Sequence, residues 1–335
     1  MKTLRVATLN CLNLALPGRR FYDGVDPYTP DEYIAKTQWL ATMFDRLAAD
    51  VVLLQEIFHE QALSDVVRQS AGGARLWSLA APLAAPDNVK PRLGIVWRQP
   101  WRPSLQTIDE FPPGCAVAVP EVGAHASFSR PLLRADLRLP QFAPGTTLTI
   151  FNVHLKSRRP DFIDGEDRAE PRTEARAQLR SLIRRGAEAA ALRAILEQAA
   201  AATKAPLIVA GDFNDDIGAV TTRIVTETLA RRDGGSESAF SLFDAIDVAQ
   251  GPPLPARIRP TSITTLEGGR GERIDHMLVS RHFLPGSKDA VGRVVAVEVF
   301  GDHLLERHRP AGHAVQFERI YADHAAVCAT LELSA

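Results

Sequence analysis

Short polar clusters stand where the apolar runs of this chain end, and they constrain its fold more than any other feature. The runs at residues 51–54 and 206–210 are of the strand type, and acids and amides follow them directly. Buried acids are costly unless they are paired, hydrogen-bonded or bound to a metal. We therefore expect the strands to carry these groups to one rim of a shared core, as in a metal-dependent hydrolytic site. The clusters are Asn10, Gln55-Glu56, Asn152 with His154, Gly211-Asp212-Phe213-Asn214, Arg273-Ile274-Asp275-His276 and Ala322-Asp323-His324.

Local signals predict a mixed sheet flanked by helices. A helix should begin at Pro30, because Thr29 can cap it and Glu32 completes a capping box. Some predicted strands follow one another without a helix between them, which argues against a purely parallel sheet. Its inward face should carry Tyr33, Thr37, Leu40, Phe44 and Leu47. Strands are expected at 4–9, 51–54, 93–97, 132–139, 148–153, 206–210, 274–280, 293–299 and 325–333, and further helices at 60–70 and 170–203.

Composition is that of an ordinary globular protein. The chain has 335 residues, a hydrophobic fraction of 45% and a net charge of -1, so no global positive field draws it onto nucleic acid. A local basic patch would still suffice for a nuclease. No break in composition divides the chain, and we expect residues 1–335 to form a single domain.

Cysteine usage and the amino terminus bear on the compartment. Cys11, Cys115 and Cys328 are widely spaced and odd in number, so we expect buried free thiols and no disulfide. The chain enters its first strand without a secretory signal, and no apolar stretch approaches the length of a membrane span. We expect a soluble, cytoplasmic protein with no membrane association and no implied protein partner.

Six motifs in order carry a family resemblance: Thr8-Leu9-Asn10, Leu54-Gln55-Glu56, Asn152-Val153-His154-Leu155-Lys156-Ser157, Gly211-Asp212-Phe213-Asn214, Ile274-Asp275-His276 and Ala322-Asp323-His324. The chain resembles the endonuclease/exonuclease/phosphatase superfamily, which includes deoxyribonuclease I, apurinic endonucleases, neutral sphingomyelinases and inositol polyphosphate phosphatases. The resemblance spans residues 4–333. It implies an α/β fold, a four-layer sandwich of two packed mixed β-sheets flanked by helices, with the site at one rim.

The resemblance also implies a divalent cation, Mg²⁺ with Mn²⁺ as a substitute. Glu56 is the expected main ligand, because Mg²⁺ takes one or two carboxylates and completes its octahedron with water and substrate phosphate. The family pattern adds the amide oxygen of Asn10 and the carboxylate of Asp323 as further metal ligands.

The catalytic roles follow from the same pattern. Asp212 and Asn214 point the same way if their segment is extended, so Asp212 can deprotonate a water while Asn214 donates to a phosphate oxygen. Taken alone, this segment is equally typical of an Asp-Asn turn. His324 should stabilise the phosphate, and Asp275 should accept its ring N–H and fix its tautomer.

Further residues are expected to bind the substrate. His154 replaces the tyrosine of some family branches and should contact phosphate or assist the leaving group. Asn152 lies on the same face and should hold phosphate, whereas Arg130 and Lys156 should counter its charge. His276 points the opposite way and is expected to be a packing histidine.

Other features are less specific. His303, His308 and His313 are irregularly spaced in one loop, which favours no metal site over a solvated loop. The arginine pairs 158/159 and 184/185 are expected on solvated faces. Leu12 stands where apurinic endonucleases carry an acid, which argues against abasic-site repair. The insertion at 157–185 is expected to form a lid that sets substrate choice.

These features predict a Mg²⁺-dependent phosphoesterase, foremost a phosphodiesterase or nuclease that acts on nucleic acid or a smaller diester by in-line attack of an activated water. A phosphomonoesterase of the inositol-phosphatase type would use the same core with different rim loops. A catalytically inactive binding module is disfavoured, because every core position carries a competent residue.

Overall fold

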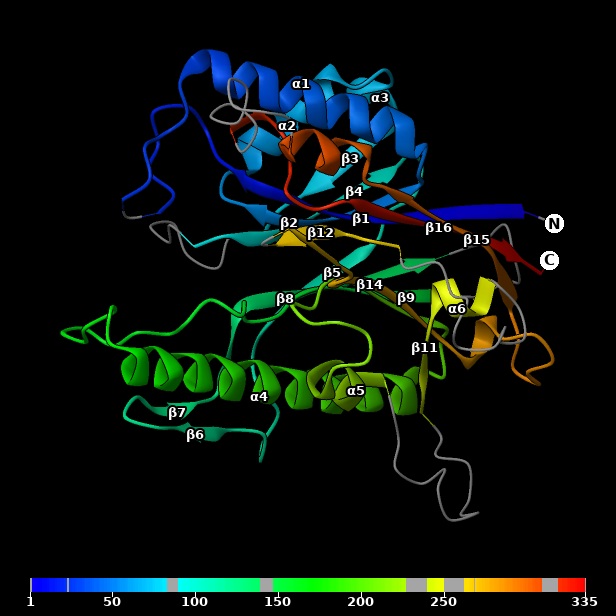
Figure 1. Cartoon of the computed structure of the whole chain (residues 1–335). Coiled ribbons are helices and arrows are strands. Elements are labelled where there is room, and N and C mark those ends of the chain that lie inside the picture. The colour runs from blue at the N-terminus through cyan, green and yellow to red at the C-terminus, as the bar shows by residue number, and fades with distance from the viewer. Residues whose placement is uncertain are drawn as a thin grey trace.

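Two six-stranded sheets pack face to face and carry helices on their outer sides (Figure 1). The computed structural model describes residues 2–22, 24–82, 90–138, 147–226, 240–249, 262–267, 269–308 and 319–334. Both sheets contain parallel and antiparallel pairs. The expected four-layer α/β sandwich is thereby confirmed.

The first sheet joins the two ends of the chain. Its first and last strands pair antiparallel from Lys2 opposite Leu333 to Thr8 opposite Val327, and Figure 1 shows the two termini side by side. In spatial order the sheet consists of β15 (Gly292–Phe300), β16 (Ala326–Leu333), β1 (Lys2–Leu14), β2 (Val51–Ile57), β4 (Arg92–Arg98) and β3 (Trp77–Ala80).

The second sheet is built from the middle of the chain. Its spatial order is β11 (Leu242–Asp244), β14 (Asp275–Ser280), β10 (Leu207–Asp212), β9 (Thr147–His154), β8 (Ser127–Arg138) and β5 (Ser104–Glu110). Two hairpins lie outside the sheets: β6 (Val117–Val119) with β7 (Gly123–His125), and β12 (Thr265–Glu267) with β13 (Arg270–Glu272). We did not predict β3, β5, β11 or the hairpin strands, which are short or, like β5, mostly exposed and polar.

Helices cover the outer face of each sheet. α1 (Pro30–Leu47) and α2 (Glu60–Gln69) pack on the first sheet, and α4 (Pro171–Thr203) and α5 (Val220–Thr226) on the second. Short α3 (Gly73–Leu76) and α6 (Ala245–Ala249), with the 3₁₀ segments at Arg281–Phe283 and Asp302–His308, complete the order. Among the described residues, no helix combines the length and apolar character that crossing a bilayer requires.

The predicted start of α1 is confirmed. The Thr29 side chain accepts from the Glu32 amide, and the Glu32 carboxylate accepts from the Thr29 amide, which completes the capping box. Its predicted inward face is buried on the first sheet. Between the sheets, a core of aliphatic side chains from β1, β2, β4, β8, β9, β10 and β14 holds the two sheets together.

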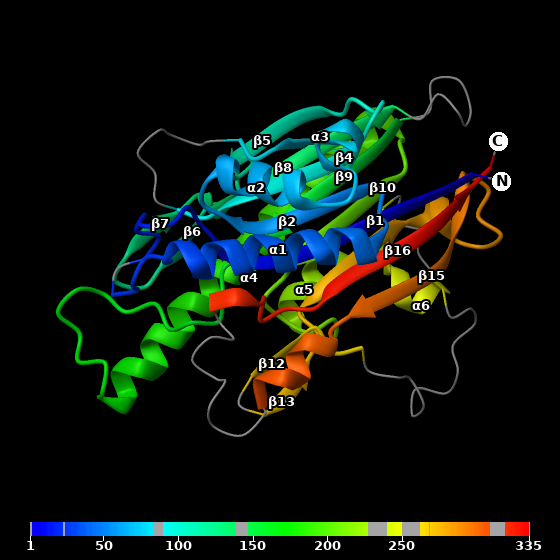
Figure 2. The ribbon, with the colours of Figure 1, turned by 90° about the horizontal axis from the view of Figure 1, so that it is seen from above.

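α4 differs from its expected pattern. It is a continuous helix in which Leu192 and Ile195 are buried, whereas Leu179 and Leu182 are 49% and 47% exposed. The N-terminal half of α4 projects past the sheets (Figure 2), so its leucines have no sheet to cover.

The expectation that the arginine pairs are solvated was wrong for three of their members. Arg158 lies in an ion pair with Glu272, and Arg184 with Asp161 at 3.1 Å. Arg185 is 6% exposed and contacts Asp215 at 3.1 Å. Helical spacing does not reveal such partners, because they come from distant segments.

Candidate active site

The predicted polar clusters meet at one rim of the sandwich. β1 is parallel to β2, and β9 is parallel to β10, so the carboxyl ends of all four strands lie at this rim. β14 and β16 run antiparallel to β10 and β1, so their beginnings reach the same rim. The residues brought there are Asn10, Glu56, His154, Asp212, Asp275 and His324.

The backbone at this rim is unusual in three places. Gly211 has φ +146°, and a Cβ there would lie 1.9 Å from the Val153 carbonyl oxygen, so only glycine lets β10 approach β9 this closely. Glu56 and Asn214 adopt left-handed φ values of 62° and 53° just after the regular ladder. Such conformations are uncommon outside glycine and often mark functional positions.

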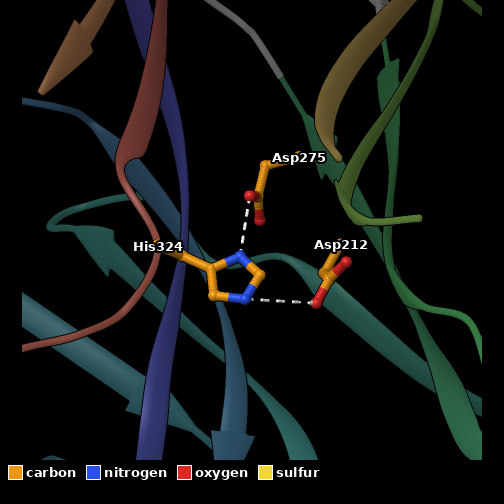
Figure 3. Close-up of side chains that lie close together, drawn as sticks. All are labelled: Asp212, Asp275 and His324. Carbon is orange, nitrogen blue, oxygen red and sulfur yellow. Dashed lines mark hydrogen bonds and ion pairs between the residues drawn. The ribbon is translucent and has the colours of Figure 1, made fainter. Parts of the chain in front are cut away.

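His324 lies between two acids, Asp275 and Asp212 (Figure 3). Its Nδ1 is 2.8 Å from Asp275 Oδ2, and its Nε2 is 3.9 Å from Asp212 Oδ2. Burial lowers the pKa of His324, but the carboxylates of Asp275, Asp212 and Asp323 outweigh burial and raise that pKa well above its ordinary value. The imidazole is therefore cationic at neutral pH, with Nδ1–H donated to Asp275 and Nε2–H toward Asp212.

Asp212 is held by donors from three different strands or turns. Its Oδ2 is 3.2 Å from Asn10 Nδ2 and 3.3 Å from His154 Nε2, and its Oδ1 accepts the Asn214 N–H at 2.8 Å. Burial raises the pKa of this carboxyl to about 7, although the charge of His324 works in the opposite direction. A buried carboxyl that ionises near neutral pH is suited to proton transfer.

His154 is neutral. Burial lowers its pKa well below the ordinary value, and the positive charges of Arg130 and His324 lower it further. Since Nε2 faces the Asp212 carboxylate, Nε2 carries the proton, and the buried Nδ1 finds no hydrogen-bond partner among the described residues. This side chain therefore helps to hold Asp212 and does not add positive charge.

Glu56, Asp323 and Asn10 were predicted to hold the metal. The Glu56 oxygens accept from Asn10 Nδ2 at 3.3 Å and from the Asn13 N–H at 3.0 Å. Asp323 Oδ1 is buried and has no hydrogen-bond partner among the described residues. A free carboxylate oxygen of this kind, beside a half-buried second carboxylate, fits a hard cation such as Mg²⁺.

Asn10 is oriented differently from the expectation. Its Nδ2 faces the two carboxylates, whereas its amide oxygen accepts the Leu12 N–H at 3.0 Å. Two acceptors require the donor end of the amide on their side. Asn10 therefore orients Glu56 and Asp212, and its amide oxygen is turned away from the expected metal.

A second group of possible metal ligands is formed by Asp212, Asp275 and His324, whose ligand atoms lie within 4.8 Å of one another. A histidine ligand must be deprotonated, and His324 is held in its cationic form by the same acids. We therefore favour Glu56 and Asp323 as the residues that would hold a metal.

Two of the expected substrate-binding residues are engaged elsewhere. Asn152 is 0% exposed, accepts from Gln55 Nε2 at 2.6 Å and donates to the Leu54 and Gly94 carbonyls, so it ties the two sheets together. Lys156 Nζ donates to the carbonyls of Ser157 and Arg159, both at 3.3 Å. Neither side chain is free to reach a phosphate in this conformation.

Arg130 and Asn214 remain close to the site. Arg130 donates to the Leu155 carbonyl at 3.3 Å, and its buried Nε has no hydrogen-bond partner among the described residues. Asn214 Nδ2 donates to the same carbonyl at 2.9 Å. The segment of Asp212 and Asn214 is thus both a turn and part of the site, which joins the two alternatives that the sequence left open.

The remaining histidines lie away from the reacting groups. His276 is buried, stacks edge-on against Phe213 and lies 2.8 Å from the Asp215 carbonyl, as expected for a packing residue. His303 is buried and lies 3.1 Å from the His324 carbonyl, so it supports that loop. The side chains of His308 and His313 lie outside the described residues.

Three supporting residues were missed by the sequence argument. Glu188 of α4 is 0% exposed at its side chain and accepts the backbone N–H of Ser129 at 2.8 Å and of Lys156 at 2.7 Å. It thus fixes the ends of β8 and β9. Arg158 donates to the Asn214 carbonyl at 3.0 Å, and Lys36 is fully buried on α1. A charged residue inside a helix pattern is the only signal that could have pointed to Glu188 or Lys36.

Comparison with known proteins supports the shared fold. The sequence profile of the Endonuclease/Exonuclease/phosphatase family matches residues 7–303. Truncated TDP2 from Caenorhabditis elegans is 16% identical, with 98% of this chain and 97% of that chain covered and a TM-score of 0.54. An endonuclease/exonuclease/phosphatase from Bacteroides vulgatus is 15% identical, with 100% of both chains covered and a TM-score of 0.55. Curated protein sequences contain no match to this chain.

Proposed function

Because this chain belongs to the endonuclease/exonuclease/phosphatase family, we propose that it is a metal-dependent phosphodiesterase. The observation that carries the proposal is the buried group of Asp212, His324 and Asp275, in which an acid that titrates near neutral pH stands beside a cationic imidazole. A base and a cation at the same rim are what hydrolysis of a phosphate ester requires.

Asp212 is the general base in this proposal. A water next to its carboxylate loses a proton to Asp212 as its oxygen attacks phosphorus, and the bond from phosphorus to the leaving oxygen breaks in line. The pKa of about 7 lets a substantial fraction of Asp212 be ionised at neutral pH while it remains basic enough to take the proton. Asn10, His154 and the Asn214 N–H hold the carboxylate in one orientation.

His324 stabilises the negative charge that grows on the phosphoryl oxygens. Asp275 accepts its Nδ1–H, so Nε2–H is the proton offered to the substrate side. Asp275 acts through His324 and is a positioning residue. When bound at Glu56 and Asp323, Mg²⁺ or Mn²⁺ would polarise the phosphate and offset its charge.

A diester is favoured over a monoester by the number of free cations. Lys156 is turned to backbone carbonyls, and Arg158 is paired with Glu272. Of the cations predicted or found next to Asp212 in the described part of the chain, His324 and Arg130 remain to face a phosphate. A phosphodiester carries one negative charge and a monoester close to two, so the diester needs less compensation. A nucleic acid is one substrate of this class.

A substrate panel tests the proposal. Bis-p-nitrophenyl phosphate, p-nitrophenyl phosphate, plasmid DNA and RNA are each incubated with Mg²⁺, Mn²⁺ or EDTA. We expect metal-dependent hydrolysis of the diester, faster than that of the monoester, and its loss in His324→Ala. Lys288→Met, an exposed substitution remote from the rim, is the control. Preferred hydrolysis of the monoester would favour the phosphomonoesterase alternative, and full activity in EDTA would contradict metal dependence.

The same site residues come from residues 10 to 324, and the first and last strands of the chain pair, which supports the proposal that residues 1–335 form one domain. Cys11, Cys115 and Cys328 are all free thiols. Free thiols are typical of proteins in a reducing compartment, and we therefore propose a cytoplasmic location.

A further inference from the structure

Lys36 is a fully buried lysine with no hydrogen-bond partner. It lies on α1 with 0% of its surface exposed, and its Nζ finds no acceptor among the described residues. The ammonium lies 5.6 Å from the centre of the Tyr28 ring, whose hydroxyl donates to the Leu12 carbonyl at 3.3 Å. Burial of an unpaired ammonium is costly, so its presence calls for a compensating interaction.

The surroundings of Lys36 are those of the candidate metal ligands. Asp323 and Glu56 both act electrostatically on Lys36, and the same two carboxylates act on Tyr28, over which the ammonium lies. Asp323 Oδ1 is itself buried without a hydrogen-bond partner among the described residues. A buried cation and a buried anion, both unpartnered, therefore lie beside one another at the end of α1.

The ammonium is charged at neutral pH. Burial lowers the pKa of Lys36 to about 8, although Asp323 and Glu56 work in the opposite direction. Cys11, the other neighbour that could carry negative charge, is a neutral thiol, because burial raises its pKa to about 12. The negative charge that faces Lys36 thus comes from the two carboxylates.

We propose that Lys36 is a fixed monovalent cation of the candidate metal site, which limits that site to one divalent ion and weakens its binding. The inference rests on the proposed function, since it assumes that Glu56 and Asp323 hold the metal. With Lys36 the two carboxylates leave one net negative charge for a metal to meet, and one bound dication already makes the site positive. A second dication would then be repelled in a buried, weakly screened environment.

This role differs from simple packing. A lysine that only fills space keeps its ammonium in water by extending along the surface, and Lys36 is 0% exposed. Replacing a merely structural buried lysine by methionine would change stability and leave metal affinity unaltered. Metal affinity and stoichiometry are therefore the decisive quantities, and both can be measured without turnover.

The test is a titration of the full-length chain with Mn²⁺, in which free Mn²⁺ is followed by electron paramagnetic resonance and heat by calorimetry. The variant is Lys36→Met, with Lys36→Gln as a second neutral replacement. The matched control is Lys288→Met, which removes the same charge from an exposed loop. Circular dichroism in EDTA checks that each variant is folded.

We expect the wild type and Lys288→Met to bind one Mn²⁺ with equal affinity. Lys36→Met should bind its first Mn²⁺ at least on the order of tenfold more tightly, because the ammonium–dication repulsion is removed. It should also take up a second ion at higher concentration.

Several results would overturn the inference. Equal affinity and stoichiometry in Lys36→Met and wild type would remove Lys36 from the metal site while leaving the proposed function intact. Two ions bound to the wild type would contradict the limit directly, even if neither Lys36 variant folds. A wild type that binds no Mn²⁺ would overturn the metal site of the proposed function together with this inference.

Discussion

Replacing Asp212 by asparagine should stabilise the metal-free protein while it abolishes most activity. Asp212 is 1% exposed, and burial raises its pKa from 3.8 to about 7. From pH 5 to pH 7 the unfolded chain therefore carries an ionised Asp212, whereas the folded chain keeps it protonated. The folded state binds more protons, so the stability of the wild type falls as the pH rises through this range.

The size of the effect follows from this difference in proton binding. Wild-type stability should fall relative to Asp212→Asn by about 1.4 kcal/mol per pH unit, or about 3 kcal/mol between pH 5 and pH 7, and the difference should level off above pH 7. The amide also turns a donor toward Asn10 Nδ2, which costs a pH-independent amount of about 1 kcal/mol. The change with pH is thus the informative quantity.

Urea denaturation in EDTA at pH 5, 6, 7 and 8 measures this change. The control is Asp216→Asn, an exposed aspartate in the following turn, for which the difference from wild type should stay flat. Turnover of the diester by Asp212→Asn should fall by a factor on the order of 10² or more, because the general base is lost. A stability difference that stays constant or shrinks from pH 5 to pH 7 would refute the reasoning.

Three further predictions concern neighbouring residues. Glu56→Ala should raise the metal concentration needed for half-maximal turnover, as measured by a Mg²⁺ titration, and an unchanged requirement would exclude Glu56 as a ligand. His324→Ala should lower kcat by a factor on the order of 10² or more; Asp275→Asn should be milder, but because His324 loses the carboxylate that raises its pKa, the basic limb of the pH–rate profile should move to lower pH. Gly211→Ala should fail to accumulate as folded protein on circular dichroism, since its Cβ would lie 1.9 Å from the Val153 carbonyl oxygen.

Much of the site was predictable because the strands deliver it. Parallel strands that end in polar residues place those residues at one sheet edge, so the proximity of His154 to Asp212 follows from their positions after adjacent strands. Asp275 comes from a strand paired antiparallel with β10, and its contact with His324 was expected from the family pattern. The capping box of α1 is equally local, since all its groups lie within four residues.

The orientation of polar side chains was not predictable in the same way. Asn10 turns its nitrogen to the acids because Leu12 takes the amide oxygen, and Asn152 is consumed between the sheets by Gln55. Each choice depends on which donors and acceptors the other sheet presents. Spacing along one strand carries no information about them.

The sequence by itself determined the order of elements, the four-layer sandwich and the set of residues at the rim, because these depend on local periodicity and on motifs within single strand ends. Only the tertiary structure decided the charge state of that rim. The pKa of Asp212, the cationic form of His324 and the burial of Lys36 arise from desolvation and from charges on segments far apart in the chain. Burial and through-space electrostatics exist only after the sheets and helices have packed.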